Sequence, residues 1–187
     1  MKNKDIFIHH LADVQSQNIG EGTRVWQFSV ILGGAKIGKS CNINCHTFIE
    51  NDVIIGDFTT IKSGVYVWDG IKIGNNVFVG PNVTFVNNKT PRSQQYPNKH
   101  KGAEIDDYVS IGANSTIMGN ISIGKYALIG AGSVLTKNVP PHTLWYGNPA
   151  QHKGYVTCDG IVLDMNMIDK ETGIEYVFRN NIIEIKK

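Results

Sequence analysis

Large apolar residues recur every six positions from Ile19 to Leu135, except for one interval of twenty positions from Phe85 to Ile105. Small or β-branched residues, of which Thr23 is the first, lie four positions after most of them. A period of six fits neither the 3.6-residue period of a helix nor the two-residue alternation of an ordinary strand, so it indicates a structural repeat. The apolar series comprises Ile19, Val25, Ile31, Ile37, Ile43, Ile49, Ile55, Ile61, Val67, Ile73, Val79, Phe85, Ile105, Ile111, Ile117, Ile123, Ile129 and Leu135.

Each hexapeptide is expected to form one short strand and one corner, and three of them close a triangular coil. Eighteen hexapeptides therefore predict an all-β fold, a parallel β-helix of about six coils. Strands of stacked coils would pair at a spacing of about 4.8 Å, with the apolar and small residues pointing inward. Glycines that follow the apolar residue, as in Ile37-Gly38 and Ile55-Gly56, fit tight corners with unusual backbone angles.

The periodic region divides the chain into three parts. Residues 1–18 lie outside the period and are predicted to cap the open end of the helix, which would protect its exposed strand edge. Residues 19–154 form the predicted β-helix, interrupted by a polar loop at residues 86–104. Residues 155–187 are predicted to form a small C-terminal β extension.

The extension contains a turn signal at residues 169–173, where Gly173 supplies the positive φ that hairpin turns need. A zinc ribbon has a similar pattern of short strands, but it requires about four Cys or His ligands. Cys158 is the only such residue in this part of the sequence. We therefore expect a metal-free β extension.

The hexapeptides of the form Ile-Gly-x-x-(Ala/Ser/Thr/Val)-x resemble those of left-handed β-helix acyltransferases, and the resemblance covers roughly residues 9–155. Residues 139–141 and 146–150 resemble the end of the same domain. Residues 80–88, with Asn87 and Asn88, and residues 91–93 are most similar to nucleotide-sugar N-acetyltransferases that act on a dTDP-linked 3-amino-3,6-dideoxyhexose. The resemblance implies a left-handed helix, acetyl-CoA as co-substrate, and a homotrimer with active sites between subunits.

An outward column is predicted at the fourth position of every third hexapeptide, because these positions stack directly above one another. His46 belongs to it and is the only histidine within the regular coils, which makes it a candidate general base or sugar ligand. A plain surface position or a subunit contact is the alternative. The column comprises His46, Gly64, Asn82, Asn114 and Gly132.

The loop at residues 86–104 is the second candidate region, because long loops on rigid scaffolds commonly carry function. The resemblance implies that Asn87, at its start, lies at the reacting amine, so Asn87 and His46 are the predicted catalytic residues. Similar enzymes often have Asp at the position of Asn88, and the amide here removes one candidate base. The predicted substrate-binding residues are Asn88, Arg92, Tyr96, Trp68, Glu50 and Asn82.

Small residues dominate the last two predicted coils, where the resemblance implies that coenzyme A lies between two subunits. Gly112, Gly130 and Ala131 would let the cofactor lie against the backbone. Lys137 and Lys153 would meet its phosphates, since an ammonium group binds phosphate as a point charge. A solvated surface role is the alternative for each single lysine.

Acetyl transfer from a thioester to an amine needs an uncharged amine, a polarised carbonyl and a thiolate that can leave. A general base gives about 10² to 10⁴ in rate, but each pKa unit of amine deprotonation costs only about 1.4 kcal/mol. Binding the amine as its free base would therefore suffice. The expected activity is acetyl-CoA-dependent N-acetylation of a dTDP-3-amino-3,6-dideoxyhexose, of the Fuc3N or Qui3N type, for surface polysaccharide or O-antigen synthesis.

Three alternative functions make different demands on the sequence. An N-acetyltransferase acting on a UDP-2,3-diamino uronic acid would need a dedicated Arg or Lys for the carboxylate, and the sequence does not indicate which one. A metal-dependent carbonic anhydrase needs three histidines around zinc, whereas the regular coils contain only His46. A non-catalytic β-helix scaffold would need neither Asn87 in a long loop nor the glycine-rich final coils.

Composition excludes several other classes. The 187 residues are 18% charged with a net charge of +2, and no basic stripe indicates nucleic-acid binding. No apolar run approaches the roughly 20 residues of a membrane helix, and no signal-peptide core follows the N-terminus. Three cysteines without a disulfide framework fit a reducing compartment, so a cytoplasmic location is expected. His9 and His10 lack a third ligand at suitable spacing, so no metal is expected.

Overall fold

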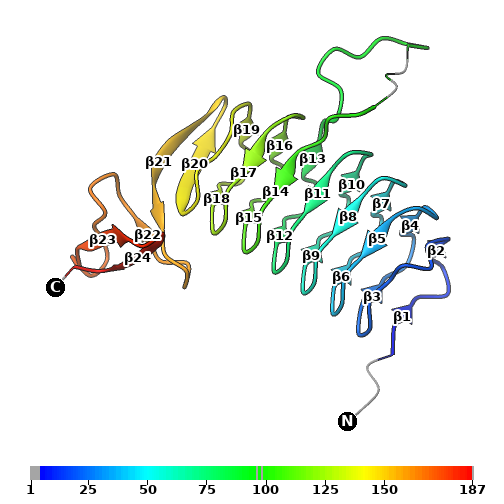
Figure 1. Ribbon diagram of the computed structural model, residues 1–187, viewed down its shortest axis with the longest axis horizontal. Coiled ribbons are helices and arrows are strands. Elements are labelled where there is room, and N and C mark those ends of the chain that lie inside the picture. The colour runs from blue at the N-terminus through cyan, green and yellow to red at the C-terminus, as the bar shows by residue number, and fades with distance from the viewer. Residues whose placement is uncertain (1–4, 96, 98, 187) are drawn as a thin grey trace.

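The computed structural model describes residues 5–95, 97 and 99–186. The chain forms a parallel β-helix in which very short strands alternate with tight corners, and a small β extension follows at the C-terminal end (Figure 1). None of the described residues belongs to a helix that is long and apolar enough to cross a membrane.

Three sheets form the sides of the triangular helix. Sheet A consists of β1 (Phe7–Ile8), β3 (Arg24–Val25), β6 (Asn42–Ile43), β9 (Thr60–Ile61), β12 (Phe78–Val79), β15 (Ser110–Ile111), β18 (Leu128–Ile129), β20 (Thr143–Gly147), β21 (Ala150–Val156) and β22 (Val162–Leu163). Sheet B consists of β2 (Asp13–Val14), β4 (Val30–Ile31), β7 (Phe48–Ile49), β10 (Tyr66–Val67), β13 (Thr84–Phe85), β16 (Thr116–Ile117) and β19 (Val134–Leu135). Sheet C consists of β5 (Lys36–Ile37), β8 (Ile54–Ile55), β11 (Lys72–Ile73), β14 (Glu104–Ile105) and β17 (Ser122–Ile123). A separate hairpin of β23 (Tyr176–Arg179) and β24 (Ile182–Ile185) lies in the extension.

The helix has about eight turns, whereas the hexapeptide count predicted six. β1 and β2 pair in parallel with β3 and β4, so the segment below Ile19 is itself a turn of the helix. At the other end, β20 continues sheet A above β18. A strict search for a period of six misses these turns because Ile19 follows Val14 by five positions and Val139 follows Leu135 by four.

The interior confirms the predicted ladder of apolar and small residues. Val25, Ile31 and Ile43 are fully buried, and so are members of the small series such as Thr23 and Thr59. The hydroxyl groups are satisfied by the coil above: Thr23 Oγ1 donates to Gly38 O at 2.7 Å and accepts the amide of Cys41 at 3.0 Å. Buried polar groups are tolerated when they are paired in this way.

We name the three edges of the triangle after the sheets that they join. Edge AB comprises residues 26–28, 44–46, 62–64, 80–82, 112–114 and 130–132. Edge BC comprises residues 32–34, 50–52, 68–70, 86–102, 118–120 and 136–138. Edge CA comprises residues 20–22, 38–40, 56–58, 74–76, 106–108, 124–126 and 140–142.

The outward column through His46 lies on edge AB, as predicted. The stacking continues across the inserted loop, since Asn82 N donates to Ser63 O and Asn114 N donates to Pro81 O, each at 3.0 Å. The column residues have φ between 57° and 75°, a left-handed conformation that Gly and Asn adopt most readily. Phe28 precedes His46 in the same column and shares this conformation.

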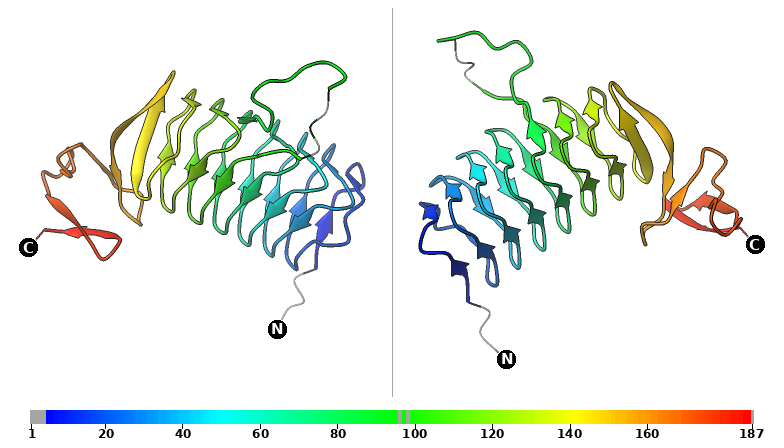
Figure 2. Two further views of the ribbon diagram at one scale, coloured as in Figure 1. Left: turned by 45° about the horizontal axis from the view of Figure 1, so that its top comes forward. Right: turned by 180° about the vertical axis from the view of Figure 1, so that it is seen from behind.

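The polar loop leaves edge BC between β13 and β14 and projects away from the helix (Figures 1 and 2). It replaces one corner of the triangle, so β11 still pairs with β14 in register across it. The coils above and below the loop therefore form one continuous scaffold.

Candidate functional site

The two predicted catalytic residues lie on different edges of the helix. His46 precedes β7 on edge AB, and Asn87 follows β13 on edge BC. Strands β7 and β13 both pair with β10, in parallel, so residues before one strand and after the other lie at opposite ends of sheet B. One chain by itself does not bring His46 and Asn87 together.

Asn87 is held in place by a chain of polar contacts along edge BC. Its Nδ2 donates to the carbonyl oxygen of Asp69 at 3.1 Å. The amide of Asp69 donates to Glu50 Oε2 at 2.7 Å, and Asp69 Oδ1 accepts the amide of Asp52 at 2.6 Å. With Nδ2 engaged, the carbonyl Oδ1 of Asn87 is the atom suited to accept a hydrogen bond from an amine.

Asp69 was not predicted as a site residue, although a signal for it exists in the sequence. It precedes Asn87 by eighteen residues, which is one full coil of three hexapeptides. The same stacking rule that placed His46 and Asn82 in one column places Asp69 directly next to Asn87.

Trp68 lies half-buried beside Asp69, at the margin of sheet B. Its ring centroid is 5.7 Å from that of Phe48 and 5.8 Å from that of Tyr66. These three side chains form an aromatic cluster on the outward face of sheet B, next to edge BC. Such a cluster offers a rigid surface against which a flat ring or a sugar can pack.

The predicted loop residues stabilise the loop itself. Asn88 Oδ1 accepts the amide of Thr90 at 3.0 Å, which forms a turn at the start of the loop. Arg92 Nη1 donates to the carbonyl oxygen of Pro91 at 2.9 Å. Tyr96, the third predicted loop residue, lies outside the described residues.

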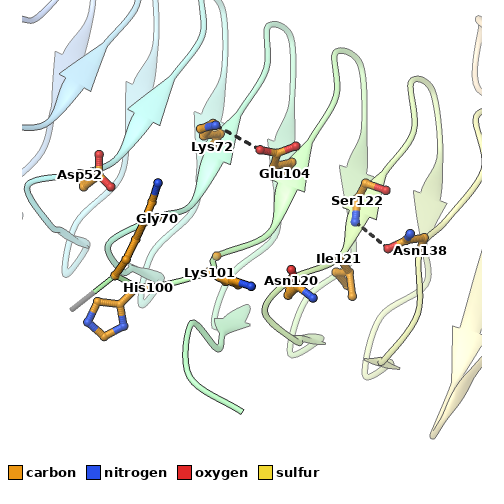
Figure 3. Close-up of a pocket in the computed structure, with 12 residues that line it drawn as sticks. Asp52, Gly70, Lys72, His100, Lys101, Glu104, Asn120, Ile121, Ser122 and Asn138 are labelled. Carbon is orange, nitrogen blue, oxygen red and sulfur yellow. Dashed lines mark hydrogen bonds and ion pairs between the residues drawn. The ribbon is translucent and has the colours of Figure 1, made fainter. Parts of the chain in front are cut away.

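Two adjoining cavities lie under the loop. The smaller one, of about 250 Å³, is lined by Asn87, Asn88, Lys89, Pro97, Lys99, Lys101 and Asn120. The larger one, of about 570 Å³, lies over sheet C and shares Lys99, Lys101 and Asn120 with the first (Figure 3). Asn87 therefore lies at one end of a hollow that continues over sheet C.

Most of the predicted cofactor residues gather at the upper part of edge AB. A Cβ on Gly112 would collide with the backbone of Ala131, and one on Gly130 would lie 2.7 Å from Tyr146 Cβ. These two glycines are therefore required by the close stacking of the coils. Lys153 Nζ lies 5.8 Å from the ring centroid of Tyr146, directly above this region.

Lys137 and Asn82 are placed differently. Lys137 lies on edge BC, two coils above Asn87. Strands β13 and β16 pair with an offset of 32 residues and β16 and β19 with an offset of 18, and the two offsets together lead from position 87 to position 137. Asn82 is exposed on edge AB. Its Oδ1 lies over Gly64 and occupies the space that a Cβ on Gly64 would need. Lys137 thus shares an edge with Asn87, and Asn82 shares one with His46.

His46 is exposed, and its imidazole stacks on the ring of Phe28 with centroids 5.0 Å apart and an interplanar angle of 25°.

Cys41 points inward, and burial raises the pKa of its thiol. Cys41 is thus a protonated core residue, as its place in the small-residue series predicted, and not a nucleophile. Among the described residues, no group of three or more His, Cys, Asp or Glu is arranged to hold a metal ion.

The repeat pattern matches a known family description. The bacterial transferase hexapeptide family, described by six repeats, matches residues 52–87 and 102–137, the two stretches on either side of the loop.

Three similar proteins, two of them acetyltransferases by name, illustrate the match. The dTDP-3-amino-3,6-dideoxy-alpha-D-galactopyranose 3-N-acetyltransferase of Aneurinibacillus thermoaerophilus is 52% identical over 150 residues, which cover 80% of this chain and 78% of the relative. The bifunctional protein GlmU of Thermotoga maritima is 30% identical, but the match covers 41% of its length. A hexapeptide-repeat-containing acetyltransferase from Vibrio cholerae O1 biovar eltor, solved in complex with acetyl coenzyme A, is 32% identical. It superposes with a TM-score of 0.56 over 65% of this chain and 70% of its own.

Proposed function

Because this chain belongs to the hexapeptide-repeat acyltransferase family, we propose that it is an acetyl-CoA-dependent N-acetyltransferase acting on the 3-amino group of a dTDP-3-amino-3,6-dideoxyhexose. The observation that carries the proposal is the 52% identity, over most of both chains, to an enzyme of that activity. The binding of acetyl coenzyme A by a related structure supports the choice of acyl donor. The product would serve surface polysaccharide synthesis.

The reaction forms an amide bond between the sugar nitrogen and the acetyl carbon, while the bond from that carbon to sulfur breaks. The amine loses one proton, and the departing thiolate can take it up directly or through water. Asn87 carries no titratable group, so it acts by positioning: its Oδ1 accepts a hydrogen bond from the amine and directs the nitrogen lone pair at the thioester. Its link to Asp69 fixes the amide orientation that this role requires.

The separation of the candidate residues on two edges supports a homotrimer with shared sites. In a closed ring of three subunits, two different surfaces of each subunit meet. Edge AB of one subunit would carry Gly112, Gly130, Ala131 and Lys153 along the path of acetyl-CoA, and His46, lower on the same edge, would face the sugar. Edge BC of the neighbouring subunit would contribute the second wall of the site.

That second wall would hold the amino sugar. Asn87 would lie at the amine and Trp68 would pack against the sugar or the base, while Glu50 holds the Asp69 amide in place. The loop at residues 86–104, with Asn88, Arg92 and Tyr96, would close the site, and Lys137 would approach the phosphates of coenzyme A from this side.

The predicted division of the chain fits this function. Residues 1–18, which include the first turn of the helix, would cover its lower end, residues 19–154 would carry the sites, and residues 155–187 would close its other end. Nucleotide sugars and acetyl-CoA are cytoplasmic metabolites, so the proposed reaction belongs to the cytoplasm.

A substrate panel tests the proposal. Purified protein is assayed for release of free thiol from acetyl-CoA with the dTDP-linked 3-amino-3,6-dideoxy derivatives of galactose and glucose and with a UDP-2,3-diamino uronic acid. We expect turnover with at least one dTDP sugar and none above background with the UDP sugar. Turnover with the UDP sugar alone would favour the rival substrate, and the absence of both turnover and coenzyme A binding by calorimetry would favour a scaffold.

A further inference from the structure

The larger cavity under the loop is built from two parts of the chain. Asp52, Lys72 and Glu104 come from the coils, and His100 and Lys101 come from the arm of the loop that returns to the helix (Figure 3). This arm is seated closely on the helix at Gly70. A Cβ on Gly70 would lie 2.8 Å from the carbonyl oxygen of His100, and the φ of +83° at Gly70 is itself one that other residues rarely adopt.

The charges around this cavity leave an excess of positive charge. Lys72 Nζ lies 3.1 Å from Glu104 Oε1, so these two side chains offset each other. Lys99 and Lys101 also line the cavity, and Asp52 is the remaining carboxylate there. Two ammonium groups thus face one carboxylate in a hollow large enough for a small anion.

His100 adds a second, independent observation. Its Nδ1 is buried, and it is the only such buried side-chain nitrogen or oxygen among the described residues that lacks a hydrogen-bond partner. Buried polar atoms are almost always paired in folded proteins, and an exception calls for a ligand, an ion or another explanation. Nδ1 can donate to a phosphate oxygen when it carries the proton.

The cavity is also continuous with the hollow at Asn87, since Lys99, Lys101 and Asn120 line both. In a nucleotide sugar the diphosphate is attached to the sugar ring, so it lies one ring away from an amine held at Asn87. We propose that this cavity binds the diphosphate of the nucleotide sugar, with Lys99, Lys101 and His100 as its contacts. This inference rests on the proposed function, because it assigns part of the same substrate.

The first test measures the affinity for dTDP by calorimetry in Lys99→Met and Lys101→Met. Each change removes one positive charge and keeps an unbranched side chain only one atom shorter. We expect the Kd for dTDP to rise about fivefold in each variant, in the range for a partly exposed ion pair. Lys39→Met is the matched control, since Lys39 is exposed on edge CA and its loss changes the net charge equally.

The second test uses His100→Phe, which keeps an aromatic ring but removes both nitrogens. If Nδ1 gains its partner from the ligand, the variant loses dTDP affinity while its melting temperature without ligand does not fall. A purely structural histidine would give the opposite result, a lower melting temperature with an unchanged Kd for dTDP, and this would remove His100 from the proposal.

The outcomes separate the inference from the proposed function. Equal Kd values for dTDP in the wild type, Lys99→Met and Lys101→Met would overturn the inference. An equal rise of the Kd in the control Lys39→Met would overturn it as well. Acetyl transfer by the wild-type protein to a dTDP-amino sugar would leave the proposed function standing in that case. Selective loss of dTDP binding in the cavity variants, without acetyl transfer to any amino sugar, would support the anion site and overturn the function.

Discussion

At the scale of single residues, Asn87 is the side chain whose geometry is most constrained toward a chemical role. Its amide group is oriented by Asp69, which is in turn held by Glu50. Each of the three belongs to a different coil, so the amide is fixed by the stacking of the scaffold and not by the loop that follows. Under the proposed function, Asn87 would therefore act through hydrogen bonding and not through acid-base chemistry.

Replacing Asn87 by Ala should lower kcat/KM for the amino sugar by about tenfold to hundredfold, the effect of losing a hydrogen bond in a buried site. The KM for acetyl-CoA should stay within about twofold, because the residue contacts the other substrate. Steady-state thiol release measures both constants. Lys153→Ala is the comparison variant, and a larger loss of turnover there than in Asn87→Ala would move the reaction centre to edge AB.

His46→Asn tests the other edge. Asn tolerates the left-handed conformation of this position, as Asn82 and Asn114 do in the same column, so the fold should be kept. We expect an unchanged affinity for acetyl-CoA together with a lower rate or a higher KM for the sugar. Kinetics identical to those of the wild type for both substrates would exclude His46 from the site.

Asp169 provides a test of the turn in the C-terminal extension. Hydrogen bonds from the Thr172 hydroxyl and the Glu171 amide hold the pKa of its carboxyl below the usual value. A lowered pKa in the folded state adds stability above the unfolded-state pKa of about 4, and this stability is lost as the pH falls through the folded-state value. In Thr172→Val the pKa of Asp169 should rise toward its usual value.

Titration of the Asp169 carboxyl carbon by NMR measures that change directly. The stability of the variant relative to the wild type should be lowest near neutral pH, and the difference should shrink in acid. Titration curves that coincide in the two proteins would mean that the Thr172 hydroxyl does not stabilise the carboxylate.

At the scale of the element, the hexapeptide unit combines one buried apolar residue with an outward-facing residue just before it, which is exposed or half-buried. Ile111 is fully buried between Val79 and Ile129 of the neighbouring strands, whereas Ser110 points outward. Each strand is held on both sides by hydrogen bonds to the adjacent coils. The coils therefore have little freedom to collapse into a void.

Ile111→Ala should accordingly destabilise the protein by about 2 to 5 kcal/mol, the range for such truncations in a rigid core. Ser110→Ala, one residue earlier, should change the stability by less than about 0.5 kcal/mol. Urea denaturation followed by circular dichroism compares the two variants. Similar losses in both would mean that the strand, and not its buried side chain, limits the stability of this coil.

At the scale of the whole molecule, the candidate residues are distributed over two edges, so one chain by itself does not bring them together. His46, Gly112, Gly130 and Ala131 lie on edge AB, while Asn87 lies on edge BC at the other end of the strands of sheet B. Two subunits must meet if these residues act together. A chain of 20.6 kDa should then sediment as a particle of about three times that mass.

Complementation between two impaired variants tests this arrangement. Ala131→Trp should block the path of acetyl-CoA on edge AB, where residue 131 is exposed, and Asn87→Ala disables edge BC. Trimers reassembled from an equal mixture should regain about a quarter of the wild-type activity, because one site in four then combines two intact edges. Mass spectrometry of the mixed trimers shows whether subunits have exchanged. If they have exchanged and the mixture is still no more active than its components, both residues belong to the site of one subunit.

The sequence by itself determined the fold, the core and the position of the loop. These follow from the six-residue period, which is a local property: the inward or outward direction of Ile111 or Thr59 depends only on its place within one hexapeptide. The family resemblance and its acyl-transfer chemistry were likewise readable from short stretches around Asn87.

Only the tertiary structure decided which candidates are neighbours. Contacts along an edge join residues one full coil apart, so they depend on the length of every coil between them. The loop lengthens one coil from 18 to 32 residues, which places Lys137 above Asn87 and leaves Gly130 on the other edge. The turn formed by β1 and β2 was missed because Ile19 follows Val14 by five positions instead of six. The contact between Asp69 and Asn87 joins residues one full coil apart, and the stacking rule that placed His46 and Asn82 in one column would have found it.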